Sequence, residues 1–357
     1  MKTGTADLPL HYGKAPSWLF QRMKRLAREI TIFIVSEFGS EEMLKRLSDP
    51  FWFQSLGCVL GFDWHSSGLT TTVCGSIKEG IKGLEEDLGF FAAGGKGRVS
   101  RKTPSEIEGF AQSLDFDPQK LVYTSKMTAK VDSAALQDGY QLYHHCFFFT
   151  RGGSWCVVQQ GMNEANRYAR RYHWLGSEVK DFVNEPHHAI CSDTRGKVLN
   201  MIAADSAGAR KISAEIAREK PQILLGELEK MQRLVLPEYH QVTVKDINPD
   251  YLGRILIKTY ETQPSNFESL LAIKGVGPKT IRAISLISEL VFGAPVSFKD
   301  PARFSFAHGG KDGYPYPVDR DNYDKSIEIL AKAINQARID RSDKVAAIKR
   351  LTLFNQG

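Results

Sequence analysis

The sequence predicts a mixed α+β domain over residues 1–192, followed by a mostly α-helical domain over residues 193–357. Two observations predict this division. Apolar runs with strand character occur mainly in the first part. From residue 195 to 260 the apolar residues recur at helical spacing, and Pro221, Pro237 and Pro249 separate the helical segments. A chain of 357 residues is long enough for two such domains.

The composition is that of a globular protein, with 42% hydrophobic and 25% charged residues, which excludes disorder for the body of the chain. No apolar stretch is long enough for a transmembrane helix, and the first residues lack the apolar run of a secretory signal. We therefore expect a cytoplasmic protein with no membrane partner. The five cysteines form no CxxC pair and are expected to be packing residues rather than metal ligands.

Positive charge is concentrated in the second part of the chain. Residues 1–192 carry 22 Lys and Arg against 21 Asp and Glu, whereas residues 193–357 carry 25 against 20. The net charge of +6 therefore lies mostly in the C-terminal domain. This bias is compatible with a polyanionic partner but does not establish one.

The first elements are predicted to be helices. Residues 16–38 have the apolar spacing of an amphipathic helix that Gly39 ends, and a short helix follows over residues 41–47. Residues 51–76 form an apolar stretch punctuated by glycines. Glycines in such a stretch indicate tight turns or a close approach of two backbones.

A glycine-rich basic loop, residues 94–103, is predicted to lead into a helix. Thr103 suits the N-cap, and Glu106 is placed to complete a capping box. The loop either clamps a phosphate backbone or is a solvated segment, and its residues leave both interpretations open. Its cations are Lys96, Arg98, Arg101 and Lys102.

Two strands and a helix are predicted next. Residues 141–149 and 154–160 are apolar runs on either side of a glycine-containing turn, as in a β-hairpin. Residues 163–174 are predicted to form a polar helix that carries Arg167, Arg170 and Arg171.

The N-terminal domain contains candidate residues for catalysis, chiefly His65 and His145. A nuclease can use a histidine as nucleophile or general base, together with carboxylates or a divalent metal. The competing interpretation for each histidine is a hydrogen-bonded structural residue. Asp132, Gln159 and Arg170 are further polar residues of this domain that favour a nuclease or substrate-recognition site.

The most specific pattern is a helical hairpin at residues 265–293. Ser265 and Glu268 have the spacing of a capping box, so a helix is expected to begin there and to run to about Ile273. The segment KGVGPKT then forms a compact turn, and a second apolar helix continues to Gly293. This arrangement is typical of the helix-hairpin-helix DNA-binding motif.

The residue types of the turn fit phosphate binding. Glycines allow a tight turn and a close approach of the backbone to a phosphate. The free N–H groups and the positive dipole end of the second helix favour an anion, and a lysine adds a positive charge. Such contacts hold the DNA backbone without reading the bases. The residues expected to contact DNA here are Gly275, Val276, Gly277, Lys279 and Thr280.

Nearly the whole chain resembles an uncharacterised archaeal and bacterial family called domain of unknown function 763. This resemblance implies relatives but supplies no mechanism. It is carried by residues 61–76, 135–163, 169–174 and 307–320.

Residues 195–350 resemble the helix-hairpin-helix DNA glycosylases of the endonuclease-three type. The resemblance implies that Lys279 of GVGPKT is a nucleophile and that Asp319 of Pro317-Val318-Asp319 is the catalytic aspartate. A longer segment separates the two residues here than in that superfamily. Either this insertion loops out and the two residues meet at one site, or the aspartate has no catalytic role.

Three hypotheses of function follow. The first is a DNA-repair glycosylase and lyase without a cofactor, in which the amine of Lys279 attacks the sugar of a damaged nucleotide. The second is a nuclease with its active site in the N-terminal domain, a divalent metal as its cofactor and the hairpin as a DNA clamp. The third is a DNA-binding repair factor without catalysis.

Overall fold

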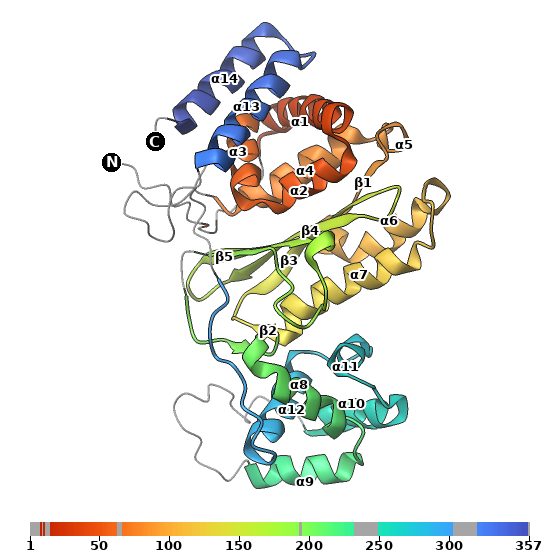
Figure 1. Ribbon diagram of the computed structural model, residues 1–357. Helices are drawn as coiled ribbons and strands as arrows, with labels where there is room; N and C mark the ends of the chain where they lie inside the picture. The colour runs from red at the N-terminus through yellow and green to blue at the C-terminus, as the bar shows by residue number, and fades with distance from the viewer. Residues whose placement is uncertain are drawn as a thin grey trace.

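The computed structural model describes residues 15–62, 66–192, 195–231, 249–302 and 320–355, together with Leu8 and Leu10. A five-stranded antiparallel sheet lies at the centre, with one layer of helices on each face (Figure 1). Helices α1–α4 (between residues 17 and 81) cover one face, and α6 (residues 103–109) and α7 (residues 119–130) cover the other. Helices α8–α12 (between residues 207 and 290) continue beyond α7, on the side away from α1–α4.

The first two N-terminal helices, α1 (Ser17–Phe38) and α2 (Ser40–Ser48), have the predicted positions. No helix was predicted for the three that follow, α3 (Pro50–Leu60), α4 (Gly68–Ile81) and the short α5 (Glu85–Leu88), and the glycine-punctuated stretch of residues 51–76 is mostly helical. The predicted helix over residues 16–38 is confirmed, and Gly39 follows its last residue with φ 88°. A Cβ on Gly57 would lie 2.6 Å from Cδ1 of Leu69. Glycine at this position therefore lets α3 and α4 pack closely.

The central sheet has the strand order β1-β3-β4-β5-β6. Its strands are β1 (Phe90–Lys96), β3 (Gln141–Thr150), β4 (Trp155–Asn163), β5 (Tyr168–Leu175) and β6 (Ala189–Cys191). The predicted hairpin of residues 141–149 and 154–160 is confirmed as β3 and β4. On β3, Phe147 and Phe149 face α7, whereas Cys146 and Phe148 face α1–α4.

The prediction of a polar helix over residues 163–174 was wrong. Most of this segment is strand β5, which pairs with β4 and β6. Arg170 and Arg171 have side chains that are at most 1% exposed. The arginines suggested a solvated helix, but both are buried with polar partners, so their charge did not indicate the exposure of the segment.

The predicted capping box at residues 103 and 106 was also wrong. Helix α6 (Thr103–Gly109) follows a 3-10 turn, η1 (Gly97–Lys102), and Oε2 of Glu106 accepts from the backbone N of Gly94 at 2.7 Å and from Nζ of Lys78 at 2.6 Å. The carboxylate therefore holds the end of strand β1 instead of capping α6. The hydroxyl of Thr103 donates to the carbonyl of Ser100 at 2.7 Å.

Beyond the sheet, a second group of elements continues the core. Phe147 of the sheet, Val131, Leu271 and Ile284 belong to one buried apolar cluster, which joins the sheet through α7 to α8, α11 and α12. This group begins with α7 (Gln119–Lys130), the π-helical turn η3 (Val131–Ala135), β2 (Leu136–Gln137) and the partner strand of β2, β7 (Leu199–Asn200). Its helices are α8 (Ala207–Ile216), α9 (Pro221–Met231), α10 (Pro249–Thr262), α11 (Phe267–Ala272) and α12 (Pro278–Leu290). Short 3-10 turns elsewhere in the chain are η2 (Ala111–Ser113), η4 (Gly176–Glu178) and η5 (Ala204–Ser206).

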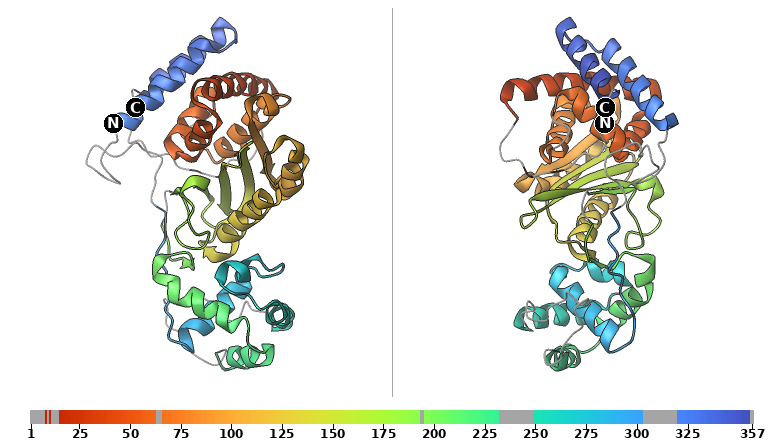
Figure 2. Two further views of the ribbon diagram at one scale, coloured as in Figure 1. Left: turned by 45° about the vertical axis from the view of Figure 1, so that its right-hand side comes forward. Right: turned by 90° about the vertical axis from the view of Figure 1, so that its left-hand side faces the viewer.

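The last two helices return to the N-terminal layer. Leu330 and Ile334 of α13 (Arg320–Gln336) are buried in the same cluster as α1, and the guanidinium of Arg350 in α14 (Arg341–Asn355) donates to the carbonyl of Val59 at 2.8 Å. Figure 2 shows both helices beside α1 and α3. The chain after residue 192 is thus split: α8–α12 form the helical part beyond α7, whereas α13 and α14 complete the layer of α1–α4.

Candidate functional site

Helix α11 begins at a side-chain cap. Oδ1 of Asn266 accepts from the backbone N of Ser269 at 2.8 Å, and Oγ of Ser269 accepts from the backbone N of Asn266 at 3.0 Å. The predicted capping box of Ser265 and Glu268 is therefore shifted by one residue. Glu268 instead accepts from the hydroxyl of Tyr123 at 2.5 Å, which ties α11 to α7.

The two glycines between α11 and α12 have different roles. Gly275 has φ +103°, and a Cβ there would lie 2.6 Å from Cδ1 of Ile255, so this position requires glycine. Gly277 has an extended backbone that any residue can adopt, and the nearest atom to a Cβ there is 3.9 Å away. Gly275 therefore makes the turn, whereas Gly277 leaves space in front of α12. Between them Val276 is fully buried and anchors the turn.

The start of α12 has backbone donors without an acceptor inside the helix. Gly277 is the N-cap and provides no side-chain cap. The first intrahelical bond runs from the backbone N of Ile281 to the carbonyl of Gly277 at 3.0 Å, so the amides of Lys279 and Thr280 precede it and have no acceptor within the helix. Lys279 is exposed. Thr280 is 1% exposed, and its Oγ1 has no hydrogen-bond partner in the described part of the chain.

The turn is fixed against the segment that follows α7. Nζ of Lys130 donates to the carbonyl of Val276, and burial lowers the pKa of this lysine. Nε2 of Gln137 donates to the carbonyl of Pro278 at 2.9 Å, while its Oε1 accepts from Nε of Arg282 at 2.9 Å. These contacts set the orientation of α12 relative to the sheet.

The glycosylase resemblance implies that Lys279 and Asp319 act as a pair, but Asp319 lies outside the described residues. Within the described ranges Lys279 makes no ion pair, and its side chain extends from the first turn of α12.

Of the two candidate histidines of the N-terminal domain, the structure describes only His145. His65 lies outside the described residues. His145 is 6% exposed, and both its ring nitrogens are engaged: Nδ1 lies 2.8 Å from Oε1 of Gln159 and Nε2 lies 2.9 Å from Oγ of Ser125. Because the amide oxygen can only accept, Nδ1 carries the proton and Nε2 accepts from the serine hydroxyl. Burial lowers the pKa of His145 and keeps the ring neutral.

Asp132 in η3 is the centre of this buried network. Its Oδ2 accepts from Nε2 of Gln159 at 2.6 Å and from Nε1 of Trp174 at 3.0 Å, and its Oδ1 lies 2.5 Å from Nε2 of His187. The network joins the sheet to the turn that supports α12. Its geometry fits the structural interpretation of His145. The sequence singled out Asp132, His145 and Gln159 but not His187. Its partner Asp132 lies 55 residues away in the sequence, so no local pattern identifies this histidine.

A second buried network surrounds Arg170. Its guanidinium donates to Oδ2 of Asp138 at 3.0 Å and to both oxygens of Asp300 at 2.8 and 3.0 Å, and the hydroxyl of Tyr172 also donates to Asp138 at 2.7 Å. Burial raises the pKa of Asp138, although Arg170 and Tyr172 act in the opposite direction. This ion-pair group joins the sheet to the segment after α12.

The basic loop is exposed, as a phosphate clamp requires. Lys96, Arg98 and Arg101 are all on the surface of β1 and η1, and Nζ of Lys96 lies 5.8 Å from the ring centroid of Tyr143. Lys96 pairs with His144 close to the start of β3. Gln137, which contacts the hairpin, lies four residues before the start of β3.

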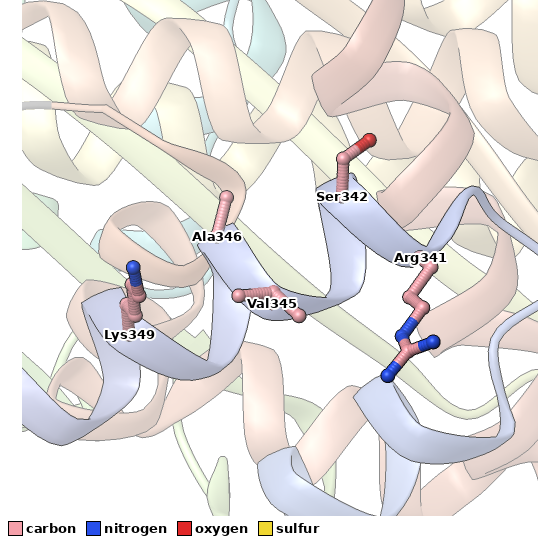
Figure 3. A pocket seen from close by; sticks show the side chains of 5 residues that line it. All are labelled: Arg341, Ser342, Val345, Ala346 and Lys349. Carbon is pink, nitrogen blue, oxygen red and sulfur yellow. The ribbon is translucent and has the colours of Figure 1, made fainter.

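The described surface is hollowed near α12 and along α14. A cleft of about 330 Å³ lies between the paired strands β2 and β7 and helix α12. A shallower hollow of about 480 Å³ is formed by one side of α14 alone (Figure 3), far along the chain from the hairpin. Its lining residues are Arg341, Ser342, Val345, Ala346 and Lys349.

The described ranges contain no three His, Cys, Asp or Glu side chains that lie close enough together to hold a metal ion. In the same ranges no helix combines the length and the apolar character needed to cross a bilayer.

Comparison with known proteins gives one match. The family described as "Protein of unknown function (DUF763)" matches residues 4–318, most of the chain. A search of curated proteins and a search of solved structures each found no match.

Proposed function

We propose that this chain, which belongs to the DUF763 family, binds DNA through the hairpin of α11 and α12, acting as a helix-hairpin-helix motif. The observation that carries the proposal is the start of α12. Gly277 supplies no side-chain cap, leaves open space in front of the helix and precedes the exposed Lys279. Uncapped amides, a helix dipole and a lysine at one point favour a phosphate group.

The contacts of this site are with the DNA backbone. Backbone amides and an ammonium group recognise phosphate oxygens, which carry no sequence information. Lys96, Arg98 and Arg101 of the exposed basic loop supply further positive charge for the same partner. The proposed binding is therefore strongly salt-dependent and only weakly sequence-dependent.

Catalysis in DNA repair is a separate part of the proposal. In the glycosylase and lyase hypothesis, the amine of Lys279 attacks C1′ of a damaged nucleotide, and the base leaves with the electrons of the glycosidic bond. The adduct then loses a proton from nitrogen as the bond from C1′ to the ring oxygen breaks, which gives the Schiff base. The exposed position of Lys279 supports its access to a DNA strand. The nuclease hypothesis has less support, because both ring nitrogens of His145 are already engaged.

The experiment that tests DNA binding replaces Gly277 with valine. An extended backbone accepts valine, so folding should be unchanged, but the side chain fills the space that a phosphate would enter. Fluorescence anisotropy with a labelled duplex should show at least about tenfold weaker binding, corresponding to loss of charge-assisted hydrogen bonds.

The matched control is Gly208→Val. Gly208 lies near the start of another helix, in the first turn of α8, and nothing within 4 Å would meet its Cβ. This variant should bind duplex DNA as the wild type does. Wild-type affinity in Gly277→Val would contradict the proposed hairpin contact.

A further inference from the structure

His144 is a buried histidine whose ring makes no hydrogen bond within the described part of the chain. Its residue is 1% exposed, and neither Nδ1 nor Nε2 has a partner there. Burial, with His145 and Lys96 acting in the same direction, lowers its pKa to about 3, so at neutral pH the ring carries one N–H donor and one acceptor nitrogen. Buried polar groups are almost always paired, so this imidazole calls for a partner.

A β-bulge places further polar groups beside this ring. The pairing of β3 with β4 shifts between Leu142 and His144, so Tyr143 and His144 share one face of the sheet instead of alternating. Gln160 is opposite His144 on β4, and its Nε2 donates to the hydroxyl of Tyr143 and, at 2.8 Å, to the carbonyl of Ser67. Its Oε1 is buried and has no donor among the described residues.

The start of helix α4 lies against these side chains. Ser67, which Gln160 contacts, is the N-cap of α4 and provides no side-chain cap. The first two amides of α4 bond to Ser66, but the amide of Thr70 has no acceptor among the described residues. An open amide and the positive end of a 14-residue helix favour an anion, and the unpaired ring of His144 lies beside them.

The site lies where the buried core meets the exposed end of the sheet. Residues 141–143 are exposed or half-buried, and His144 is the first buried residue of β3. Lys96, the last residue of β1, is exposed and is paired with His144 in the sheet. It also belongs to the basic loop. A negatively charged group is therefore attracted to this edge, one strand away from the buried ring.

The donors and acceptors of the site match a phosphate monoester. The ring N–H of His144, the amide of Thr70 and the ammonium of Lys96 are donors for phosphate oxygens. Oε1 of Gln160 can only accept, so it needs a ligand with an O–H group. A phosphate monoester, with a second pKa of about 6, has an O–H in its monoanionic form. A phosphodiester of the DNA backbone has none, and its chain continues on both sides, which a buried site does not admit.

We propose that the groups around His144 and the start of α4 bind the terminal phosphate of a DNA strand. The inference rests on the proposed function for the source of this phosphate, because DNA binding brings a strand to the protein. It assigns the substrate class as DNA with a phosphorylated end, as at a strand break. The buried groups hold the end, and the cations of the basic loop contact the phosphates that follow it.

The first test compares three labelled duplexes of one sequence, whose ends carry a 5′-phosphate, a 3′-phosphate or only hydroxyl groups. Fluorescence anisotropy with the full-length protein should show at least about tenfold tighter binding of a phosphorylated duplex than of the hydroxyl duplex. His144→Leu should reduce this preference to less than about twofold without lowering the stability, because the ring has no partner to lose. Lys96→Gln, a surface change, should reduce it by about threefold.

The second test examines the site without DNA, using inorganic phosphate and sulfate. Both are tetrahedral anions, but only phosphate retains an O–H group near neutral pH. At equal ionic strength phosphate should raise the thermal midpoint of the wild type more than sulfate does. His144→Leu should remove this difference. Equal effects of the two anions on the wild type are the result expected if the polar groups hold only water.

Lys82→Gln is the matched control. Lys82 is exposed at the C-terminal end of α4, so its replacement removes one cation from the opposite end of the same helix. It should keep the wild-type preference. Equal affinities of the wild type for the three duplexes, together with equal effects of phosphate and sulfate, would overturn this site alone. If the wild type binds no duplex but keeps a phosphate effect that His144→Leu removes, DNA is refuted as the source of the phosphate, and the proposed function fails with it.

Discussion

Nε of Arg282 donates to Oε1 of Gln137 at 2.9 Å, so a residue of helix α12 is bonded to the segment that leads into the central sheet. The same glutamine donates to the carbonyl of Pro278, the first residue of α12. One side chain therefore fixes both the start of α12 and the position one turn later. Whatever binds at the start of α12 is consequently held at a defined orientation to the sheet.

The first prediction concerns Lys279. Lys279→Gln removes one cation from an exposed helix start, so the affinity for duplex DNA should fall modestly and the salt slope should drop by about one unit. If the amine is also the nucleophile, strand cleavage at a lesion must vanish even at saturating DNA, because no Schiff base can form. Anisotropy and single-turnover cleavage measure the two effects separately. A saturated variant that cleaves at the wild-type rate would exclude the lyase mechanism.

The second prediction separates the two glycines of the turn. Gly275→Ala should lower the free energy of unfolding by about 2–3 kcal/mol, because φ is +103° and the new Cβ meets Ile255. Gly277→Ala should change it by less than about 0.5 kcal/mol, because its backbone is extended and the space is open. Urea unfolding measures both values. Equal stabilities of the two variants would show that Gly275 does not make the turn.

The third prediction concerns the buried network around Asp132. Asp132→Ala leaves the donors of Gln159 and Trp174 without their acceptor, so the free energy of unfolding should fall by about 3 kcal/mol or more. His145→Ala should also destabilise the protein, because both of its ring contacts are lost. Chemical denaturation measures the change. A His145→Ala protein with wild-type stability but no turnover would restore the catalytic interpretation of this histidine.

The fourth prediction concerns pH. Burial lowers the pKa of His144 to about 3, with neighbouring His145 and Lys96 acting in the same direction. Above about pH 6.5 the ring is neutral in both the folded and the unfolded chain, so it makes no pH-dependent contribution. Between about pH 6.5 and 3 only the unfolded chain binds the proton. The free energy of unfolding should therefore fall by about 1.4 kcal/mol per pH unit for this group.

His144→Gln tests this assignment because glutamine is polar but does not titrate. Unfolding curves at several pH values should show a smaller acid-induced loss of stability in the variant than in the wild type. His145 has a pKa lowered by burial as well, so part of the loss should remain. Identical pH profiles for the two proteins would refute the assignment.

The elements with the strongest apolar periodicity were predictable from the sequence. The helix over residues 16–38, the hairpin of β3 and β4 and the helical pair at residues 265–293 all have apolar faces of the expected spacing. Strand β5 was not predictable in this way. Arg170 and Arg171 lie on opposite faces of the sheet and are both buried, and the carboxylates and the amide that pair with them come from distant parts of the sequence.

The candidate site was predictable only in part. The GVG segment predicted where α12 begins. The sequence alone does not show which of its two glycines the turn requires. The folded structure distinguishes them: Gly275 has φ +103° and a Cβ there would meet Ile255, whereas Gly277 has an extended backbone and open space. The cleft combines Lys197, Arg282 and Phe298, which are brought together by tertiary packing and share no local pattern.

The return of α13 and α14 to α1 and α3 has a consequence for the synthesis of the chain. Leu330 and Ile334 pack in the same cluster as Ile30 and Ile34 but follow them by 300 residues in the sequence. This part of the apolar surface of α1 is therefore covered only after residues up to 334 have been made. Contacts between residues so far apart in the sequence form slowly, so we expect this layer to be completed late in folding.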